Sequence, residues 1–450
     1  MKPTIAIAGA SGFIGRWFIE KYHQDFNIIA LSRKELIGEE RPNITWRKVD
    51  LYSLSSTSEA LKGADYAFYL VHSMQPSTRL NQGSFEDTDL LLADNFSRSA
   101  QACGIKQIIY VGGILPKDPN DFSRHLRSRY EVEQTLGARS TPVTALRAGI
   151  IIGPGGSSFT IVEKLVKRLP AMACPKWTTS YSQPIDVDDV MKIMVQCIGN
   201  EKTVNQSIEI GGPLRITYMN LLKKTAAKMG YNRWIFSVPF FTLGLSKLWV
   251  GLFSDSSPVF VGPLIESLRH DMTIEDDQKV TFDINYISLD DSILKSIKGK
   301  APVVPTRSIA VQERNTVRSV QRLPNPAGKT ANWVADEYQH WLPRLFRYFM
   351  TVVEKEDIVS FNLLGIKLLE LKIVHDRSDQ DRQLFYIVGG QLVKQTNQGW
   401  LEFRSVLDNK FVIAAIHEFV PRLPWFIYRN TQARVHLWVM NRYGDFLKTL

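Results

Sequence analysis

The sequence predicts the α/β fold class: a doubly wound parallel sheet with helices on both faces, followed by a smaller α+β domain. Three observations lead to this prediction. Short apolar runs alternate with helical patterns over the first 210 residues, as in βαβ units. From about residue 330, strand patterns follow one another with hairpin turns between them. At 450 residues the chain is also long for one hydrophobic core, which favours two domains.

Seven stretches are expected as strands of the parallel sheet. Most are near-continuous apolar runs, as expected of strands that are covered on both faces. They are Thr4–Ala8, Asn27–Ser32, Thr45–Val49, Tyr66–Val71, Gln107–Val111, Val143–Arg147 and Ser207–Ile210. Between two of them, Leu90–Cys103 has the apolar spacing of a helix.

The charge and the cysteines narrow the class of protein. The net charge is +10, from 55 basic and 45 acidic residues, but the basic residues are scattered and form no dense block. No nucleic-acid partner is therefore expected. The three cysteines are far apart and odd in number, which suits neither a disulfide framework nor a zinc site. A strand pattern begins almost at once, in place of a signal peptide, so a cytoplasmic protein is expected.

Residues 9–15, GASGFIG, join the first expected strand to a helix that is expected to begin near Phe13. In this position Gly9 permits a tight turn, Gly12 lets the backbone approach a pyrophosphate, and Gly15 lets the helix pack closely on the strand. The free N–H groups at the helix N-terminus attract phosphate. The sequence therefore predicts a nucleotide-binding loop of the Rossmann type, with a plain strand–helix turn as the alternative.

The residues after the second and third strands bear on which nucleotide binds. The second strand ends in Ser32, Arg33 and Lys34, where an NAD-binding protein would carry an acid for the ribose hydroxyls. A guanidinium favours the 2′-phosphate of NADP, so NADP is expected, with NAD as the alternative. Asp50 is placed either to meet the adenine amino group or to cap the next helix, whose start is expected within Ser53–Ser58.

Several ordered motifs resemble one family. They are GASGFIG, Val49–Leu51, Phe68–Ser73, Tyr110–Gly113, Leu146–Gly155, Pro184–Val190 and Glu209–Pro213. Together they resemble the atypical short-chain dehydrogenase/reductases, above all the NmrA-like group and the Rossmann-type accessory subunit of respiratory complex I. The likeness covers about the first 230 residues and runs more loosely to about residue 300.

The resemblance implies a set of cofactor-binding residues. They are Gly9, Ser11, Gly12, Phe13, Ile14, Gly15, Arg33, Asp50, Leu51, Val71, His72, Ser73 and Gly112. For His72, an ordinary loop position is the alternative. No metal site is expected, because the acidic run Asp186–Asp189 is better explained as the first turn of a helix over Val190–Ile198.

The catalytic residues of this family are altered. Its active members use a Tyr-x-x-x-Lys pair on a helix, and the corresponding stretch has His125 at the tyrosine position and Arg129 at the lysine position. The fifth strand ends in Gly112-Gly113, without the usual hydroxyl residue. His125 is thus the candidate general acid and Arg129 the candidate ribose ligand. A polar helix that merely faces solvent is the alternative for both.

The chain is expected to have four parts. Residues 1–230 form the NAD(P)-binding domain, residues 231–300 an apolar segment that completes it, residues 301–329 a linker, and residues 330–450 the second domain. The stretch 234–268 is the most apolar, but its prolines, glycines and Lys247 disfavour a membrane span. Covering the cofactor cleft is its expected role, with peripheral membrane contact as an alternative.

The second domain resembles the START-like helix-grip folds, in which an antiparallel sheet is closed by a long C-terminal helix. Its expected strands are Leu368–Val374, Gln383–Val388, Trp400–Leu407 and Phe411–Val420. The final helix is expected from about Trp425, with Ala433, Leu437, Met440, Gly444 and Leu447 on one face. The resemblance implies an apolar pocket, with a filled core as the alternative. His417 and His436 are expected to be structural.

Two hypotheses about function follow. In the first, the protein is an NADPH-dependent reductase of a carbonyl or double bond in an apolar lipid, quinone or isoprenoid-like molecule. In the second, it binds NADP(H) without turnover, as a redox sensor or a structural or assembly protein, because the Tyr-x-x-x-Lys pair is missing.

Overall fold

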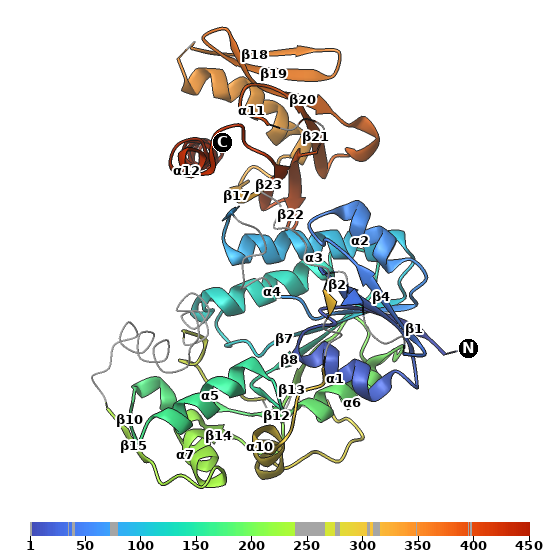
Figure 1. Ribbon diagram of the computed structural model, residues 1–450, viewed down its shortest axis with the longest axis vertical. Coiled ribbons are helices and arrows are strands. Elements are labelled where there is room, and N and C mark those ends of the chain that lie inside the picture. Colours follow the sequence, from blue (N-terminus) through green and yellow to red (C-terminus); the bar gives the residue numbers. More distant parts are fainter. Residues whose placement is uncertain are drawn as a thin grey trace. The chain divides into compact units, whose positions relative to one another are not determined.

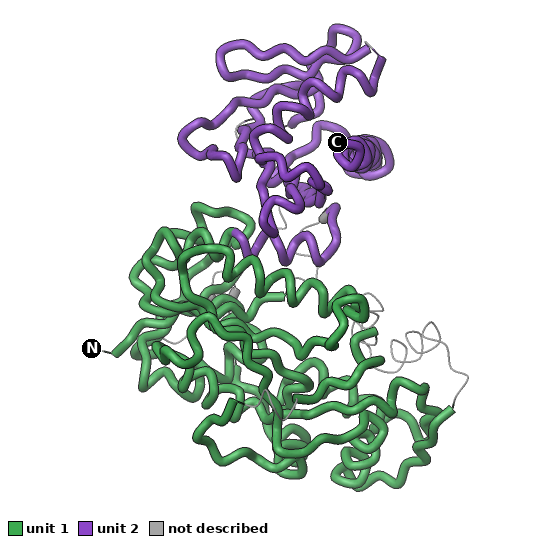
Figure 2. The backbone as a smooth tube through the Cα atoms, turned by 180° about the vertical axis from the view of Figure 1, so that it is seen from behind, with its two compact units in different colours: residues 1–74, 95–310 green, residues 75–94, 311–450 purple. Residues whose placement is uncertain are grey.

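A computed structural model describes residues 2–34, 36–37, 41–72, 80–238, 266–274, 280–303, 307–308, 316–347, 349–394, 396 and 398–450. The chain divides into two compact units (Figure 2). Unit 1 comprises Met1–Met74 and Asn95–Ala310, and unit 2 comprises Gln75–Asp94 and Val311–Leu450. The second unit therefore includes a segment from the N-terminal half of the chain.

Unit 1 is built on a seven-stranded sheet in which every pairing is parallel (Figure 1). The strands lie in the order β13-β8-β7-β5-β1-β2-β4. Their bounds are β1 Thr4–Ala8, β2 Asn27–Ser32, β4 Ile44–Lys48, β5 Tyr66–Tyr69, β7 Gln107–Gly113, β8 Val143–Ala148 and β13 Ser207–Ile210. These are the strands expected from the sequence, and the doubly wound α/β class is confirmed.

The helices of unit 1 pack on both faces of this sheet. They are α1 Phe13–Tyr22, α2 Leu54–Leu61, the C-terminal part of α3 Phe85–Ala102, α4 Arg124–Leu136, α5 Ser157–Arg168, α6 Val187–Cys197, α7 Tyr218–Lys228 and α10 Leu289–Lys298. On one face, Phe18 of α1 and Val190 of α6 share a core cluster with Ile7 of β1. On the other face, the ring of Phe96 from α3 lies 4.9 Å from that of Tyr69 in β5.

Shorter pairings complete unit 1. They are β9 Ile151–Ile152 with β12 Ile185–Asp186, β10 Ala171–Cys174 with β15 Trp234–Ser237, β11 Tyr181–Ser182 with β14 Ile216–Thr217, and β3 Leu36–Ile37 with β16 Arg307–Ser308. The acidic run begins a helix, as expected, because the Asp186 side chain accepts the N–H of Asp188 at 2.8 Å and caps α6. Most of the apolar stretch 234–268 lies outside the described residues.

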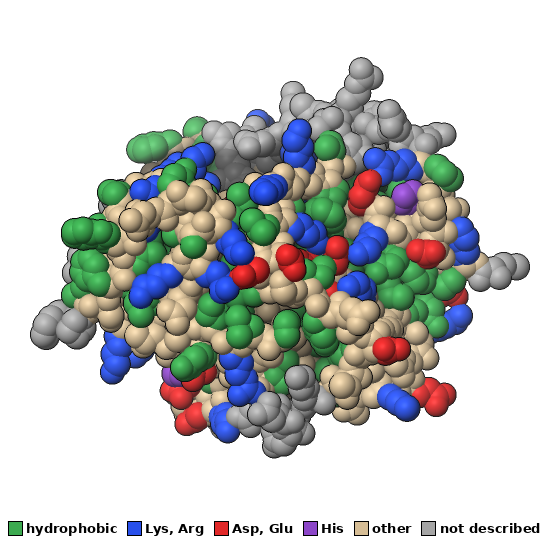
Figure 3. All heavy atoms as spheres, turned by 90° about the horizontal axis from the view of Figure 1, so that it is seen from below, with side chains coloured by type: hydrophobic (Ala, Val, Ile, Leu, Met, Phe, Trp, Pro, Cys, Tyr) green, Lys and Arg blue, Asp and Glu red, His purple; other side chains and the backbone are tan. Residues whose placement is uncertain are grey.

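The length and apolarity of the helices and the distribution of surface charge bear on membrane and nucleic-acid partners. No helix within the described ranges is both long enough and apolar enough to cross a membrane. Figure 3 looks onto one face of the molecule, and there the described Lys and Arg side chains are interspersed with Asp and Glu.

Unit 2 contains an eight-stranded sheet in the order β18-β19-β20-β21-β22-β23-β17-β6. All its pairings are antiparallel except that of β6 with β17. The strands are β6 Leu80–Gln82, β17 Val317–Pro324, β18 Met350–Lys355, β19 Ile358–Leu363, β20 Ile366–Ile373, β21 Arg382–Gly389, β22 Trp400–Val406 and β23 Phe411–Phe419. The helices are the N-terminal part of α3, α11 Ala331–Leu345, α12 Trp425–Asn430 and α13 Gln432–Leu447. An antiparallel sheet with a C-terminal helix is thus confirmed.

An apolar core joins this sheet to α11 and α13. Phe385, Phe403 and Val412 of the sheet share a buried cluster with Trp341 of α11 and Met440 of α13. These residues alternate along their strands with the residues of the opposite face.

The opposite face of the sheet is charged, although it is buried. Residues directly opposite each other in antiparallel strands share a face, so Arg382, Arg404 and Arg322 form one row across β21, β22 and β17, with Ile413 of β23 in the same row. Glu402, two positions from Arg404, lies on the same face. Arg382 and Arg404 are buried and Arg322 is half-buried, so each of these cations needs a neighbouring anion.

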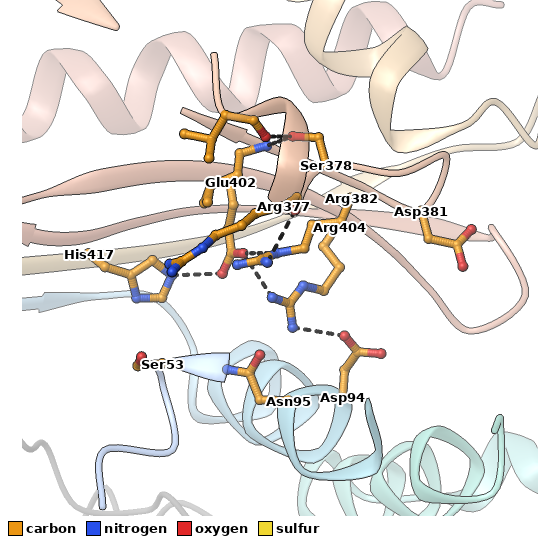
Figure 4. Close-up of polar contacts among 12 residues, drawn as sticks. Ser53, Asp94, Asn95, Arg377, Ser378, Asp381, Arg382, Glu402, Arg404 and His417 are labelled. Atoms are coloured by element: carbon orange, nitrogen blue, oxygen red, sulfur yellow. Dashed lines mark hydrogen bonds and ion pairs between the residues drawn. The ribbon is translucent and has the colours of Figure 1, made fainter. Parts of the chain in front are cut away.

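Four residues on this face and Asp94 of α3 form a buried network, which we call the Glu402 cluster. One Glu402 oxygen accepts hydrogen bonds from Arg382 Nε at 2.7 Å and from Arg404 Nη2 at 2.8 Å (Figure 4). The other oxygen lies 3.1 Å from His417 Nε2, and Asp94 of α3 pairs with Arg404 Nη1 at 2.9 Å. Burial alone would raise the pKa of Glu402, but the charges of Arg404 and Arg382 hold that pKa well below its ordinary value.

The segment from the N-terminal half joins unit 2 through specific contacts. β6 adds to the edge of β17, and Asp87 of α3 pairs with Arg322 at 2.7 Å. Leu90–Cys103 was expected to be a helix of the first domain. The helix starts five residues earlier, at Phe85, and its first half is counted with unit 2.

Details of the C-terminal half differ from expectation. β17 lies within 301–329, which was expected to be a linker. Arg318 and Arg322 interrupt its apolar strand pattern, so the sequence did not predict this strand. The final helix is interrupted at Thr431, between α12 and α13. Leu437, expected on the same face as the buried Met440, is exposed.

Candidate cofactor and active site

The glycine loop between β1 and α1 has the backbone shape that requires glycine. Gly9 has a φ of +91°, and a Cβ there would lie 2.8 Å from the Leu70 carbonyl oxygen. A Cβ on Gly15 would lie 2.4 Å from the Gly9 carbonyl oxygen, so α1 packs directly on the loop. The loop lies where β1 has β2 on one side and β5 on the other. This reversal of strand order is where parallel α/β sheets bind nucleotides.

The N-terminus of α1 fits a diphosphate. Gly12 is the N-cap residue, and no side chain in the described part of the chain caps this helix. The first-turn N–H groups of Phe13, Ile14 and Gly15 have no acceptor within the helix and carry its positive dipole end. Ser11 is exposed beside them. The described residues therefore fit the phosphates of NAD(P).

Phe13 closes one side of this cradle. A Cβ on Gly156, the N-cap residue of α5, would lie 2.9 Å from the Phe13 ring, and a Cβ on Gly153 would lie 3.3 Å from it. The glycine-rich start of α5 thus lies against the start of α1.

The ends of β2 and β4 carry the residues expected at the adenosine. Arg33 is exposed, and the Ser32 hydroxyl accepts the N–H of Lys34 at 3.2 Å. Asp50 Oδ1 accepts the N–H of Tyr52 at 3.2 Å. The cap of α2 is Ser53, so the alternative role of Asp50 as that cap is wrong.

Three further cofactor candidates are Leu51, Val71 and Ser73. Leu51 is buried, and its carbonyl oxygen accepts a hydrogen bond from Asn95 at 2.8 Å. Val71 follows β5 and is half-buried, while Ser73 lies outside the described residues.

His72 and His125 lie together, although they come from different elements. His72 follows β5, and His125 is in the first turn of α4, which Ser123 caps by accepting the N–H of Leu126. The two ring centroids are 5.0 Å apart. Burial, the nearby charge of Arg129 and His72 together hold the pKa of His125 well below its ordinary value. His125 is therefore a neutral imidazole at neutral pH.

Arg129 lies one helical turn beyond His125. Its backbone carbonyl accepts a hydrogen bond from the Tyr110 hydroxyl of β7 at 3.1 Å, which fixes α4 against the sheet. A Cβ on Gly112 would lie 2.9 Å from the Tyr110 ring, and a Cβ on Gly113 would lie 3.2 Å from Leu126. A side chain at this strand end would thus crowd Tyr110 of the same strand or Leu126 of α4.

A polar hollow was not predicted from the sequence. It has a volume of about 710 Å³ and lies beside β8, β13 and the loop after β7. Its lining includes Tyr130 of α4, Arg147 of β8 and Glu209 of β13, together with His270 and Asp271. None of the predicted site residues lines it. Single polar residues in otherwise apolar strands were the only available signal in the sequence.

The comparisons with known proteins identify the first domain. Residues 9–199 match a protein-family model described as NAD(P)H-binding. This part of the chain is an NAD(P)-binding Rossmann domain. The match begins at Gly9, the first glycine of the loop.

Two curated relatives resemble parts of the chain. The auxiliary protein GraX of Staphylococcus aureus is 30% identical over 146 residues, which are 32% of this chain and 43% of GraX. The mitochondrial NADH-ubiquinone oxidoreductase 40 kDa subunit of Neurospora crassa is 19% identical over 290 residues, which are 62% of this chain and 74% of that subunit. The chain thus spans less than half of the length of GraX.

Solved structures share the fold of the NAD(P)-binding domain. A nucleoside-diphosphate-sugar epimerase from Staphylococcus aureus has a TM-score of 0.52 at 15% identity, and covers 65% of this chain and 99% of its own. A triphenylmethane reductase from Citrobacter sp. has a TM-score of 0.50 at 15% identity, and covers 66% of this chain and 99% of its own. At this identity the likeness shows the fold alone.

Proposed function

We propose that the protein is an NADPH-dependent reductase that acts on an electron-poor apolar acceptor, such as a quinone or another conjugated carbonyl compound. The observation that carries the proposal is the contact between His72, which follows β5, and the neutral His125, with 5.0 Å between the ring centroids. The nicotinamide, when bound, supplies the hydride.

Separate residues would bind the cofactor and stabilise the reacting acceptor. The first turn of α1 holds the diphosphate, and Arg33 holds the 2′-phosphate. A neutral His125 donates a hydrogen bond to the acceptor oxygen rather than a full proton, and the cation of Arg129 stabilises negative charge that develops there. A quinone suits such a site because the charge left by the hydride spreads over its ring. The balancing proton comes from water.

The identity of the residue at position 125 is expected to control turnover. In His125→Phe the hydrogen bond to the acceptor is lost, and kcat for a quinone acceptor should fall roughly a hundredfold or more. NADPH affinity should stay within about threefold. Because the pKa of His125 is lowered, the wild-type rate should be independent of pH between about 6 and 8. Stopped-flow oxidation of NADPH measures both, and an unchanged rate in His125→Phe would remove His125 from the mechanism.

Arg33 is expected to determine the preference for NADPH. Arg33→Ala removes a charge-assisted contact with the 2′-phosphate, so NADPH should bind roughly ten- to a hundredfold more weakly. NADH lacks this phosphate, and its affinity should change by less than about threefold. Fluorescence titration with the two nucleotides measures both constants. An equal loss for NADPH and NADH would contradict the NADP assignment.

A second function is favoured by a different observation. Gly112 and Gly113 end β7 without a hydroxyl, and α4 lacks the Tyr-x-x-x-Lys pair. These features suit a protein that binds NADP(H) without turnover, as a redox sensor or an assembly protein. The discriminating experiment adds quinones and lipid extracts to the NADPH complex. Tight binding without any oxidation of NADPH would favour this second function.

A further inference from the structure

Unit 2 exposes an apolar surface that joins three separate segments. Phe349 is 62% exposed, Leu364 72%, Val435 52% and Trp438 45%. We call these four residues, with Arg434 and Arg442, the Trp438 surface. Large apolar side chains that gather on a surface mark a contact with another molecule or a membrane.

The members of the Trp438 surface are neighbours in space. The ring of Trp438 on α13 lies 6.2 Å from that of Phe346, at the end of α11. The N–H of Phe349 bonds to the Phe346 carbonyl at 3.1 Å, and the N–H of Leu364 bonds to the Phe349 carbonyl at 2.9 Å. The surface therefore continues from α13 across the α11–β18 turn to the β19–β20 turn.

The turn that carries Leu364 is an unusual place for a leucine. Leu364 and Gly365 form a two-residue turn with φ values of +50° and +80°. Such turns favour asparagine and glycine, and a leucine there is both strained and exposed to water. Leu364 thus places an apolar side chain at a turn position where the backbone conformation favours asparagine or glycine.

The charge around this surface is positive. Arg434, Trp438 and Arg442 occupy successive turns of α13, so Trp438 lies between two arginines. Neither arginine forms an ion pair with a described acid. From residue 419 to residue 444 the sequence contains four arginines and no acidic residue. The next acid, Asp445, pairs with Lys448 at 2.9 Å.

The acidic residues of the neighbouring β18–β19 hairpin lie at the end of the strands that is far from the Trp438 surface. Glu354, Glu356 and Asp357 lie at the β18–β19 turn, whereas Phe349 and Leu364 lie at the other end of these strands. The strands separate the two ends by roughly 16 Å. The apolar residues therefore share their end of the sheet with arginines.

We propose that the Trp438 surface docks on an anionic lipid bilayer. Tryptophan, phenylalanine and leucine side chains enter the headgroup region, where amphipathic rings are favoured, and Arg434 and Arg442 bind lipid phosphates. The excess of arginine over acid along α12 and α13 matches a negatively charged membrane. This contact would be peripheral and is distinct from the apolar stretch 234–268.

The test is cosedimentation of the full-length protein with vesicles. Wild-type protein should sediment with vesicles that contain phosphatidylglycerol and not with pure phosphatidylcholine. Arg434→Gln with Arg442→Gln should lower the partition coefficient on the order of thirtyfold. Leu364→Asn with Trp438→Gln should abolish sedimentation. Asparagine suits the turn at position 364, so the fold should persist. Thermal unfolding verifies the fold of each variant.

Matched substitutions on unit 1 provide the control. Tyr181→Gln with Leu214→Asn replaces an exposed aromatic residue and an exposed leucine, and Lys176→Gln with Lys202→Gln removes two exposed charges. Both should leave sedimentation unchanged. Equal binding to both kinds of vesicle, or binding that survives in the Trp438-surface variants, would overturn the proposal. So would a concentration-dependent dimer that Trp438→Gln abolishes, because the surface would then belong to a second copy of the chain.

Discussion

Gly12→Val is expected to abolish NAD(P)H binding while the protein stays folded. Gly12 has an ordinary φ of −77°, and a Cβ there meets only the Gly9 carbonyl oxygen, at 3.0 Å. The rest of a valine side chain would occupy the space through which the backbone approaches the pyrophosphate. Losing two or more hydrogen bonds to phosphate weakens binding roughly a hundredfold or more. Fluorescence titration with NADPH measures this effect.

Gly137→Val is the matched control for this prediction. Gly137 has a φ of −81° at the end of α4, is exposed, and a Cβ there has only ordinary contacts, the nearest at 3.6 Å. The Gly137→Val variant should bind NADPH with the same affinity as the wild type. Gly15→Ala, by contrast, should unfold or distort the loop, because its Cβ would lie 2.4 Å from the Gly9 carbonyl oxygen. Unchanged NADPH affinity in folded Gly12→Val would contradict the cofactor site itself.

Glu402→Gln is expected to destabilise unit 2 by about 3–5 kcal/mol, the range typical of breaking a buried ion pair by removing one partner. Glu402 is fully buried, and it neutralises Arg382 and Arg404, which are also buried. A glutamine keeps the shape of the side chain but removes its negative charge, so the positive charge of the two arginines is no longer balanced. Urea unfolding of the full-length chain measures the change in the free energy of unfolding.

The pH dependence of stability gives this prediction a second measurement. The folded-state pKa of Glu402 is lowered, so its contribution is present above the unfolded pKa of about 4.3 and is lost as pH falls through the folded pKa. Glu402→Gln should remove this part of the acid sensitivity. Glu354→Gln, an exposed residue of β18, should change stability by less than about 0.5 kcal/mol. Equal stability of both variants would show that the Glu402 cluster does not hold unit 2 together.

Local chemistry explains what could be predicted from the sequence. The loop glycines follow an apolar strand; Gly9 and Gly15 leave no room for a Cβ, and Gly12 leaves space for the pyrophosphate to approach. The strands of unit 1 are covered on both faces and therefore read as continuous apolar runs. In both cases the requirement leaves its mark in a short stretch of sequence, even where the contacts themselves are distant.

Long-range pairing explains what could not be predicted. The contact between His72 and His125 depends on how β5 and α4 meet, which no local pattern encodes. β17 escaped prediction because Arg318 and Arg322 interrupt its apolar pattern, and their acidic partners Glu418 and Asp87 are distant in the sequence. Arg318 and Arg322 are compatible with a buried strand only because these distant acids neutralise them.

The inclusion of residues 80–94 in unit 2 has a consequence for synthesis on the ribosome. Asp94 and Arg404 are 310 positions apart, and at 5–20 residues per second the ribosome needs roughly 15–60 s to make that length. During this interval β6 lacks its partner strand β17, and Asp87 and Asp94 lack their distant partners Arg322 and Arg404. The start of α3 therefore stays exposed to solvent while the parallel sheet of unit 1 is synthesised. It can contact its final partners only after the last third of the chain has left the ribosome.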